Sequence, residues 1–156
     1  MRITKYDTRI NRINNRPDVI KEKSVNYSGF QKLDNPSAIV QVMNDLFDVE
    51  NLTEEHMYML TTNVKLNFNG VFEVSHGGMS SCALSPKDLL SKAILCGAYG
   101  IVLLHNHPSG YSLQSSDDVN FTKRMNACCE LLDLEFFDHI IVGYGEYLSF
   151  REENLL

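Results

Sequence analysis

The sequence predicts one α/β (α+β) domain in which helices flank a mixed β-sheet, and three patterns carry this prediction. The stretches N-P-S at 35–37 and S-P-K-D at 85–88 each place a capping residue and a proline before apolar residues at helical spacing. Polar and apolar residues alternate at 56–60 and 66–74, as they do in half-buried strands. The continuous apolar run at 101–104 is typical of a central strand. We therefore expect an α/β sandwich.

The elements are expected in the order αββαβαββ. Asn35 and Ser85 are the N-caps of the first two helices, and Pro36 and Pro86 occupy their first positions. Ser115 begins a third helix, in which apolar side chains recur on one face. In chain order, the expected elements are a helix over about 36–48, strands over 56–60 and 66–74, a helix over about 86–98, a strand over 101–104, a helix from Ser115, and a closing hairpin formed by 136–143 and 147–150.

The composition is that of a globular domain. The chain has 156 residues, of which 44% are hydrophobic and 22% charged, and this balance excludes the disordered class. No apolar run approaches the ~18–20 residues of a membrane span, and the first ten residues contain no signal-peptide core. We expect a cytoplasmic protein with no membrane partner.

Charge divides the chain into two regions. Residues 1–35 hold eight lysines and arginines against four acidic residues, a net charge of +4, whereas the remainder carries −10. We interpret 1–34 as a basic, solvated N-terminal extension and 35–156 as the folded domain. The acidic body argues against a broad nucleic-acid-binding face, so any contact with nucleic acid is expected to be weak and made through 1–35.

The four cysteines suggest neither a thiolate zinc site nor a disulfide framework. Cys82, Cys96, Cys128 and Cys129 show no C-x-x-C spacing, and two of them are adjacent. We expect small buried thiols, with a Cys/His nucleophilic site as the alternative.

The stretch L-L-H-N-H-P-S-G-Y-S-L-Q-S-S-D-D at 103–118 is a candidate metal site. In an extended segment His105 and His107 point to the same side while Asn106 points away. Asp118, in the first turn of the following helix, lies where it can fold back and offer a carboxylate as a third ligand. The alternatives are a surface histidine pair and an acidic residue that only completes the capping box of Ser115.

The same residues carry a family resemblance. H-N-H-P, six residues (109–114), Ser115, two residues and Asp118 resemble the JAMM (MPN+) zinc-hydrolase motif, and H-N-H-P-S-G resembles its RadC branch. The family's upstream glutamate, five residues before a glycine, matches Glu73 and Gly78, and D-H-I-I-V-G at 138–143 resembles a family strand. Over about 34–150, this resemblance implies a JAB/MPN-type three-layer sandwich, similar to cytidine deaminases, with a mixed sheet and flanking helices.

The resemblance also implies a chemistry. His105, His107 and Asp118 would hold one Zn²⁺ per chain, and Glu73 would take a proton from the zinc-bound water and pass it to the leaving amine. Ser115 would donate a hydrogen bond to the oxyanion. The implied substrate is a peptide or an isopeptide-linked protein, and the sequence leaves the oligomeric state open.

The chain departs from the family pattern in three places. Ser112 and Gln114 stand where RadC loops carry prolines, and S-P-K at 85–87 replaces H-P-R, which puts any role of those side chains in doubt. Too few residues precede Asn35 for the helix-hairpin-helix region of longer RadC proteins.

Two other functional interpretations stay open beside the hydrolase. One is a non-catalytic binding or scaffold module of the same fold. The other is a DNA-repair-associated accessory factor whose basic extension contacts DNA. Among the remaining histidines, we interpret His76 as a solvent-facing loop residue, His139 as a strand residue hydrogen-bonded near Asp138, and His56 as a strand-edge residue.

Overall fold

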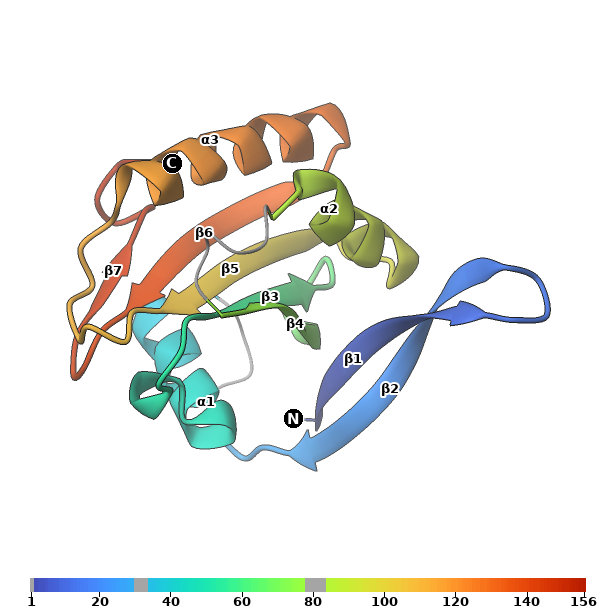
Figure 1. Cartoon of the computed structure of the whole chain (residues 1–156), viewed down its shortest axis with the longest axis horizontal. Helices are drawn as coiled ribbons and strands as arrows, with labels where there is room; N and C mark the ends of the chain where they lie inside the picture. The colour runs from blue at the N-terminus through green and yellow to red at the C-terminus, as the bar shows by residue number, and fades with distance from the viewer. Residues whose placement is uncertain (1, 30–33, 78–83) are drawn as a thin grey trace.

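The computed structural model describes residues 2–29, 34–77 and 84–156, and they form a seven-stranded sheet with helices on both faces (Figure 1). The strand order is β2-β1-β4-β3-β5-β6-β7. The elements are β1 (Arg2–Asn11), β2 (Arg16–Asn26), α1 (Pro36–Phe47), the short 3-10 helix η1 (Val49–Asn51), β3 (His56–Thr62), β4 (Phe68–His76), α2 (Pro86–Leu95), β5 (Gly100–Asn106), α3 (Ser116–Leu131), β6 (Glu135–Val142) and β7 (Tyr147–Ser149). This architecture confirms the predicted mixed α/β sandwich.

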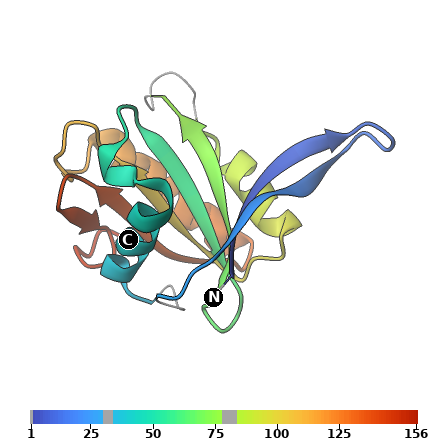
Figure 2. The ribbon, with the colours of Figure 1, turned by 90° about the horizontal axis from the view of Figure 1, so that it is seen from below.

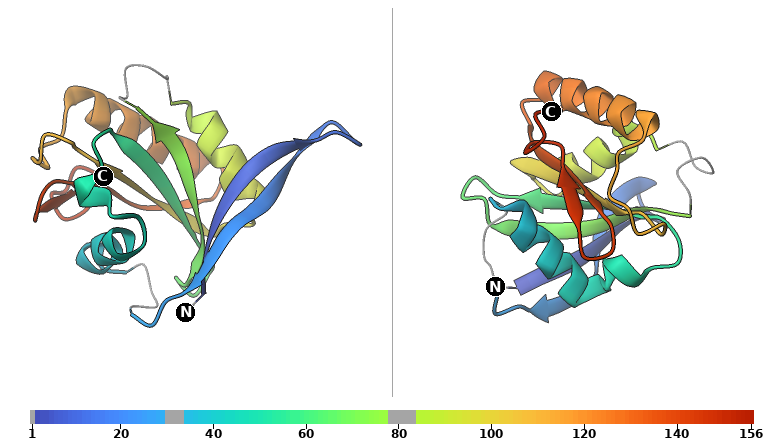
Figure 3. Two further views of the ribbon diagram at one scale, coloured as in Figure 1. Left: turned by 60° about the horizontal axis from the view of Figure 1, so that its bottom comes forward. Right: turned by 90° about the vertical axis from the view of Figure 1, so that its left-hand side faces the viewer.

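The sheet separates two hydrophobic cores, which gives the domain three layers (Figure 3, right). Tyr58 and Leu104 belong to the core beneath α1, whereas Met57 and Leu103 belong to the core beneath α2 and α3. Because consecutive residues of a strand point to opposite faces, β3 and β5 are buried on both sides. This explains the continuous apolar run of β5.

The predicted helices are present, and one of them ends early. Asn35 caps α1 by accepting a hydrogen bond from the backbone N–H of Ala38 at 3.4 Å. The second helix stops at Leu95 instead of residue 98, because Gly97 adopts a positive φ of 65°. The sequence predicted a longer second helix because the small residues after Leu95 continue the helical pattern.

The N-terminal segment forms a hairpin instead of the solvated leader we expected. β1 pairs with β2 along its whole length and joins the sheet in parallel to β4 through the pairs Lys5↔Val71 and Tyr6↔Phe72. Beyond these pairs the hairpin projects from the body (Figure 2). Ile3 at its base is buried, whereas Ile13 at its tip is 96% exposed.

The sheet brings the motif residues to one edge of the fold. β5 continues two residues past the predicted 101–104 and includes His105 and Asn106. It runs parallel to β6, and α3 begins ten residues after β5 ends, so its N-terminus returns to this edge. In the described parts of the chain, no helix has both the length and the apolar character needed to cross a lipid bilayer.

Candidate metal centre

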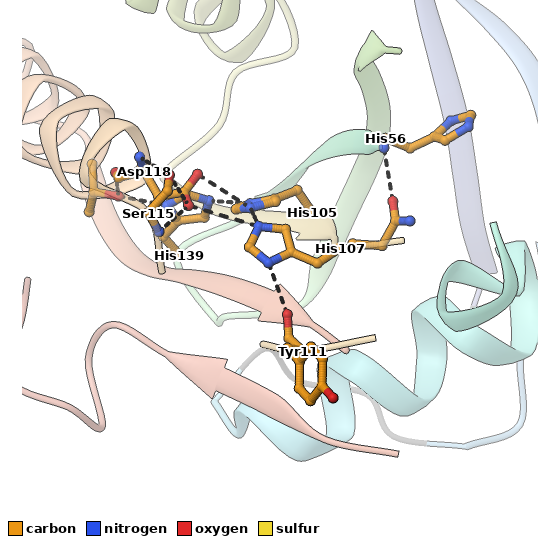
Figure 4. Close-up of polar contacts among 9 residues, drawn as sticks. His56, His105, His107, Tyr111, Ser115, Asp118 and His139 are labelled. Carbon is orange, nitrogen blue, oxygen red and sulfur yellow. Dashed lines mark hydrogen bonds and ion pairs between the residues drawn. The ribbon is translucent and has the colours of Figure 1, made fainter. Parts of the chain in front are cut away.

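His105 and His107 extend from the end of β5 toward the same point (Figure 4). His105 lies in the strand, and the backbone N–H of His107 donates to the carbonyl of Val142 on β6 at 2.9 Å. Their Nε2 atoms are 3.0 Å apart. Asn106 points away, accepting a hydrogen bond from the His56 backbone N–H at 2.8 Å. The extended backbone therefore gives the two-residue spacing the geometry that the sequence predicted.

Asp118 joins the two histidines while it also caps α3. Its Oδ2 accepts hydrogen bonds from the backbone N–H and the hydroxyl of Ser115, at 2.7 and 2.6 Å. Its Oδ1 lies 3.4 Å from Nε2 of His105. The side chain is buried, with 3% exposed. Oδ2 thus serves the capping box and lies 3.8 Å from Nε2 of His107, while Oδ1 faces His105, so the capping and ligand roles are compatible.

A chain of hydrogen bonds determines which nitrogen of His105 carries a proton. Thr122 Oγ1 donates to the backbone carbonyl of Asp118 at 2.7 Å, so it must accept from Nδ1 of His139, 2.6 Å away. Nε2 of His139 is then unprotonated and accepts from Nδ1 of His105 at 2.9 Å. The lone pair of His105 consequently lies on Nε2, which faces His107 and Asp118.

The proton and the lone pair of His107 are arranged on its ring nitrogens in the same way as those of His105. Its Nδ1 is 3.0 Å from the carbonyl oxygen of Tyr111, which only accepts, so Nδ1 carries the proton and Nε2 the lone pair. Two lone pairs thus face each other beside a carboxylate. Burial lowers the pKa of His105 to about 4, although Asp118 opposes the shift, so the His105 ring is neutral at neutral pH. This arrangement suits a cation between the ligands.

The donor atoms fit a tetrahedral zinc ion. The Nε2 atoms are 3.0 Å apart, and Asp118 oxygens lie 3.4 Å from His105 Nε2 and 3.8 Å from His107 Nε2. Tetrahedral zinc with bonds of ~2.0–2.1 Å separates its ligand atoms by about 3.3–3.4 Å. Two imidazoles and a carboxylate also match catalytic zinc sites, which keep a fourth position open. The His107 side chain is 18% exposed, so the group is accessible from solvent.

The chain also matches a known protein family. Residues 33–155 match the family described as "RadC-like JAB domain". The chain belongs to the RadC-like JAB family.

Similar proteins come from several bacteria. A protein named "UPF0758 protein" from Aquifex aeolicus (strain VF5) is 38% identical over 122 residues, which cover 78% of this chain and 52% of the relative. The "UPF0758 protein CA_C1241" of Clostridium acetobutylicum is 34% identical over 132 residues, covering 83% and 57%. The "UPF0758 protein" of Clostridium kluyveri is 34% identical over 119 residues, covering 76% and 51%. The chain spans about half the length of the curated relatives it matches.

Glu73, the glutamate of the RadC-like motif, contacts a different set of residues. It pairs across β4 and β3 with Tyr58, whose side chain faces α1, whereas His105 pairs with Met57 on the other face of the sheet. Its carboxylate accepts from Lys5 Nζ and His56 Nδ1, both at 2.8 Å. Burial alone would raise the pKa of Glu73, but these two bonds outweigh it and hold the pKa below its usual value.

The structure thus brings His105, His107, Asp118 and Ser115 together and places Glu73 in a neighbouring cluster. Gly78, the glycine expected after Glu73, lies outside the described residues.

Two residues of the RadC-like site were missed by sequence reasoning. His139 is the strand residue we expected, and its backbone N–H donates to Asp138 Oδ1 at 2.8 Å. Its ring, however, is fully buried between His105 and Thr122. The available signal was a histidine in the apolar run of the strand that pairs with β5. Thr122 carried no signal, because a threonine in a helix is common.

Cys96 and Cys129 are not poised as nucleophiles. Burial raises the pKa of the Cys129 thiol to about 12 and also raises that of Cys96, so both remain protonated at neutral pH. Cys82 lies outside the described residues.

Proposed function

We propose that this RadC-like JAB domain is a zinc-dependent hydrolase that cleaves amide or isopeptide bonds. The observation that carries the proposal is the pair of Nε2 lone pairs that meet the Asp118 carboxylate at a solvent-accessible edge. A zinc ion bound there would supply a Lewis acid and lower the pKa of a water molecule to about 7.

The chain's own residues orient this centre. The Thr122–His139 pair holds His105 in one tautomer, and the Tyr111 carbonyl holds His107. Hydrogen bonds of this kind fix ligand rings and raise their basicity. Rigid donors therefore support a preformed site.

Ser115 has two possible tasks in this proposal. Its hydroxyl donates to Asp118 Oδ2 in the capping box. If the hydroxyl turns toward a substrate oxyanion, the Ser115 backbone N–H still bonds the same oxygen at 2.7 Å. This backbone hydrogen bond to Asp118 therefore remains when the hydroxyl rotates, and we propose Ser115 as the oxyanion donor.

Glu73 is proposed as the general base. Its pKa is lowered, so the carboxylate is ionised and able to accept a proton at neutral pH. The role requires the side chain to leave Lys5 and His56 and reach the face of the sheet that carries His105.

That requirement favours a second candidate, a metal-stabilised binding module without catalysis. In it, zinc on His105, His107 and Asp118 would only stabilise the fold, and Glu73 would remain bonded to Lys5.

One experiment separates the two candidates. Wild type and Glu73→Gln are assayed on a panel of peptide and isopeptide conjugates, with zinc content measured in parallel. Loss of a general base costs ~10²–10⁴ in rate, so the hydrolase predicts full zinc content and very slow turnover in the variant. Turnover equal to wild type would exclude Glu73 as the base, and no turnover by wild type on any conjugate would support the binding module.

A further inference from the structure

A second group of metal-ligating side chains lies on the other side of β3. One donor atom from each of Glu54, His56 and His76 lies within 4.8 Å of the others. His56 begins β3, His76 ends β4, and the two are cross-strand partners with ring centroids 4.2 Å apart. Glu54 Oε2 is 2.5 Å from His76 Nε2. Three separate segments therefore converge on one point.

The hydrogen bond to Glu73 prepares His56 as a ligand. The ionised carboxylate of Glu73 only accepts, so His56 Nδ1 carries the proton and Nε2 carries the lone pair. A histidine that donates one ring N–H to a carboxylate is the usual arrangement around metal ligands in proteins. The His56 side chain is only 13% exposed, which holds the ring in place.

Asn106 fixes the backbone of two of these residues. Its buried amide accepts from the His56 N–H at 2.8 Å and donates to the Glu54 carbonyl at 3.0 Å. Asn106, which lies between His105 and His107 in the sequence, thus links the second group to β5 through these two hydrogen bonds.

The surroundings attract cations. Glu73 and Glu22 both form ion pairs with Lys5, at 2.8 and 3.3 Å. A cleft of about 340 Å³ borders the group and is lined by residues that include Lys5, Asp7, Glu22, Glu73 and His76. Acidic side chains outnumber the single lysine on this wall, so the local potential is negative. The cleft and the exposed Glu54 and His76 give an ion free access.

We propose that Glu54, His56 and His76 form a second divalent-cation site, separate from His105, His107 and Asp118. Two imidazoles and one carboxylate suit Zn²⁺, Ni²⁺ or Cu²⁺ better than Mg²⁺ or Ca²⁺, which prefer oxygen ligands. Side chains of Glu54 and His76 are 57% and 61% exposed and must be ordered on binding, so this site is the weaker of the two. The proposal does not depend on hydrolase activity.

Zinc titration of metal-free protein tests the site. After dialysis against a chelator, calorimetry should resolve two ions per wild-type chain, the second bound at least about tenfold more weakly. His76→Ala and Glu54→Gln should each bind one ion, because a ligand is lost. Glu153→Gln, an exposed acid outside both groups, is the matched control and should keep two. A single ion in wild type, or two ions in His76→Ala, would overturn the proposal.

A second measurement distinguishes the loss of a zinc site from the misfolding of a variant. Zinc should raise the thermal midpoint of His107→Ala, in which the second group is intact, because a ligand that binds only the folded state stabilises it. It should not do so in His107→Ala/His76→Ala. Equal midpoints with and without zinc in His107→Ala, or equal shifts in both proteins, would contradict the site.

Discussion

Nδ1 of His105 lies 2.9 Å from Nε2 of His139, and the ring of His139 is held in turn by Thr122. This contact decides the direction of the lone pair on His105, so a residue on β6 determines the donor atom that β5 offers. Burial also lowers the pKa of His139 well below its usual value, which keeps the ring neutral and able to accept. The candidate metal centre is therefore built from two neighbouring strands and the helix between them.

Removal of the His139 acceptor should weaken zinc binding. His139→Phe keeps an aromatic ring beside Phe150, whose ring centroid is 4.9 Å away, but leaves Nδ1 of His105 without its partner. We expect zinc affinity to fall by ~10–100-fold, as is typical for residues that orient ligands. Competition with a chromogenic chelator measures this. His139→Gln, which retains an acceptor, should lose less, and a full wild-type affinity in His139→Phe would refute the orienting role.

Asp118 and Ser115 should respond differently to substitution. Asp118→Asn keeps an oxygen for the cap but removes the charge that faces His105, so zinc affinity should fall strongly while stability changes by at most about 1 kcal/mol. Ser115→Ala removes the cap side chain and should cost ~0.5–2 kcal/mol, with zinc affinity less affected. Chemical denaturation and chelator competition on both variants give the comparison. Unchanged zinc binding in Asp118→Asn would mean that the residue only caps the helix.

The motif residues could be predicted because their spacing is local. His105, His107 and Asp118 lie within one strand, one turn and one helix start, and each of these has its own sequence signal. His139 reaches the same point only through the pairing of β5 with β6, which no local pattern encodes. The contact of Lys5 with Glu73 likewise depends on the docking of β1 beside β4.

The hairpin of β1 and β2 escaped prediction for a related reason. Its outer half is solvated on both faces, so charged residues alternate with few apolar ones and the period of two is lost. Only its base, at Ile3, is buried in the core of the domain.

Lys5 should make stability depend on pH through Glu73. The pKa of Glu73 is held low in the folded state, so its stabilising contribution is present above the unfolded value of 4.5 and is lost as the pH falls through the folded value. Lys5→Met should therefore lower the free energy of unfolding by up to about 1 kcal/mol near pH 7 and much less below pH ~4. Urea denaturation at several pH values, with Lys21→Met as an exposed control, measures the difference. A gap between wild type and Lys5→Met that is independent of pH would argue against the ion pair.

Any binding of nucleic acid should be weak and electrostatic. We propose that it uses the hairpin, where Arg9, Arg12 and Arg16 cluster near the tip. With about three phosphate contacts, the slope of log affinity against log salt should not exceed about −3 in magnitude. Gel-shift assays with unrelated duplexes at several salt concentrations give this slope. A salt-resistant, sequence-selective shift would instead favour the DNA-repair accessory interpretation.

We propose that His105, His107 and Asp118 hold a zinc ion. The most direct test is the zinc content of His76→Ala, in which the second group is disabled, measured by plasma emission spectroscopy after purification without chelator. We predict one zinc per chain in this variant and well under a tenth of that in His76→Ala/His107→Ala. Zinc well below one per chain in His76→Ala that cannot be restored by added metal, or one zinc retained in the double variant, would contradict zinc binding by these three residues.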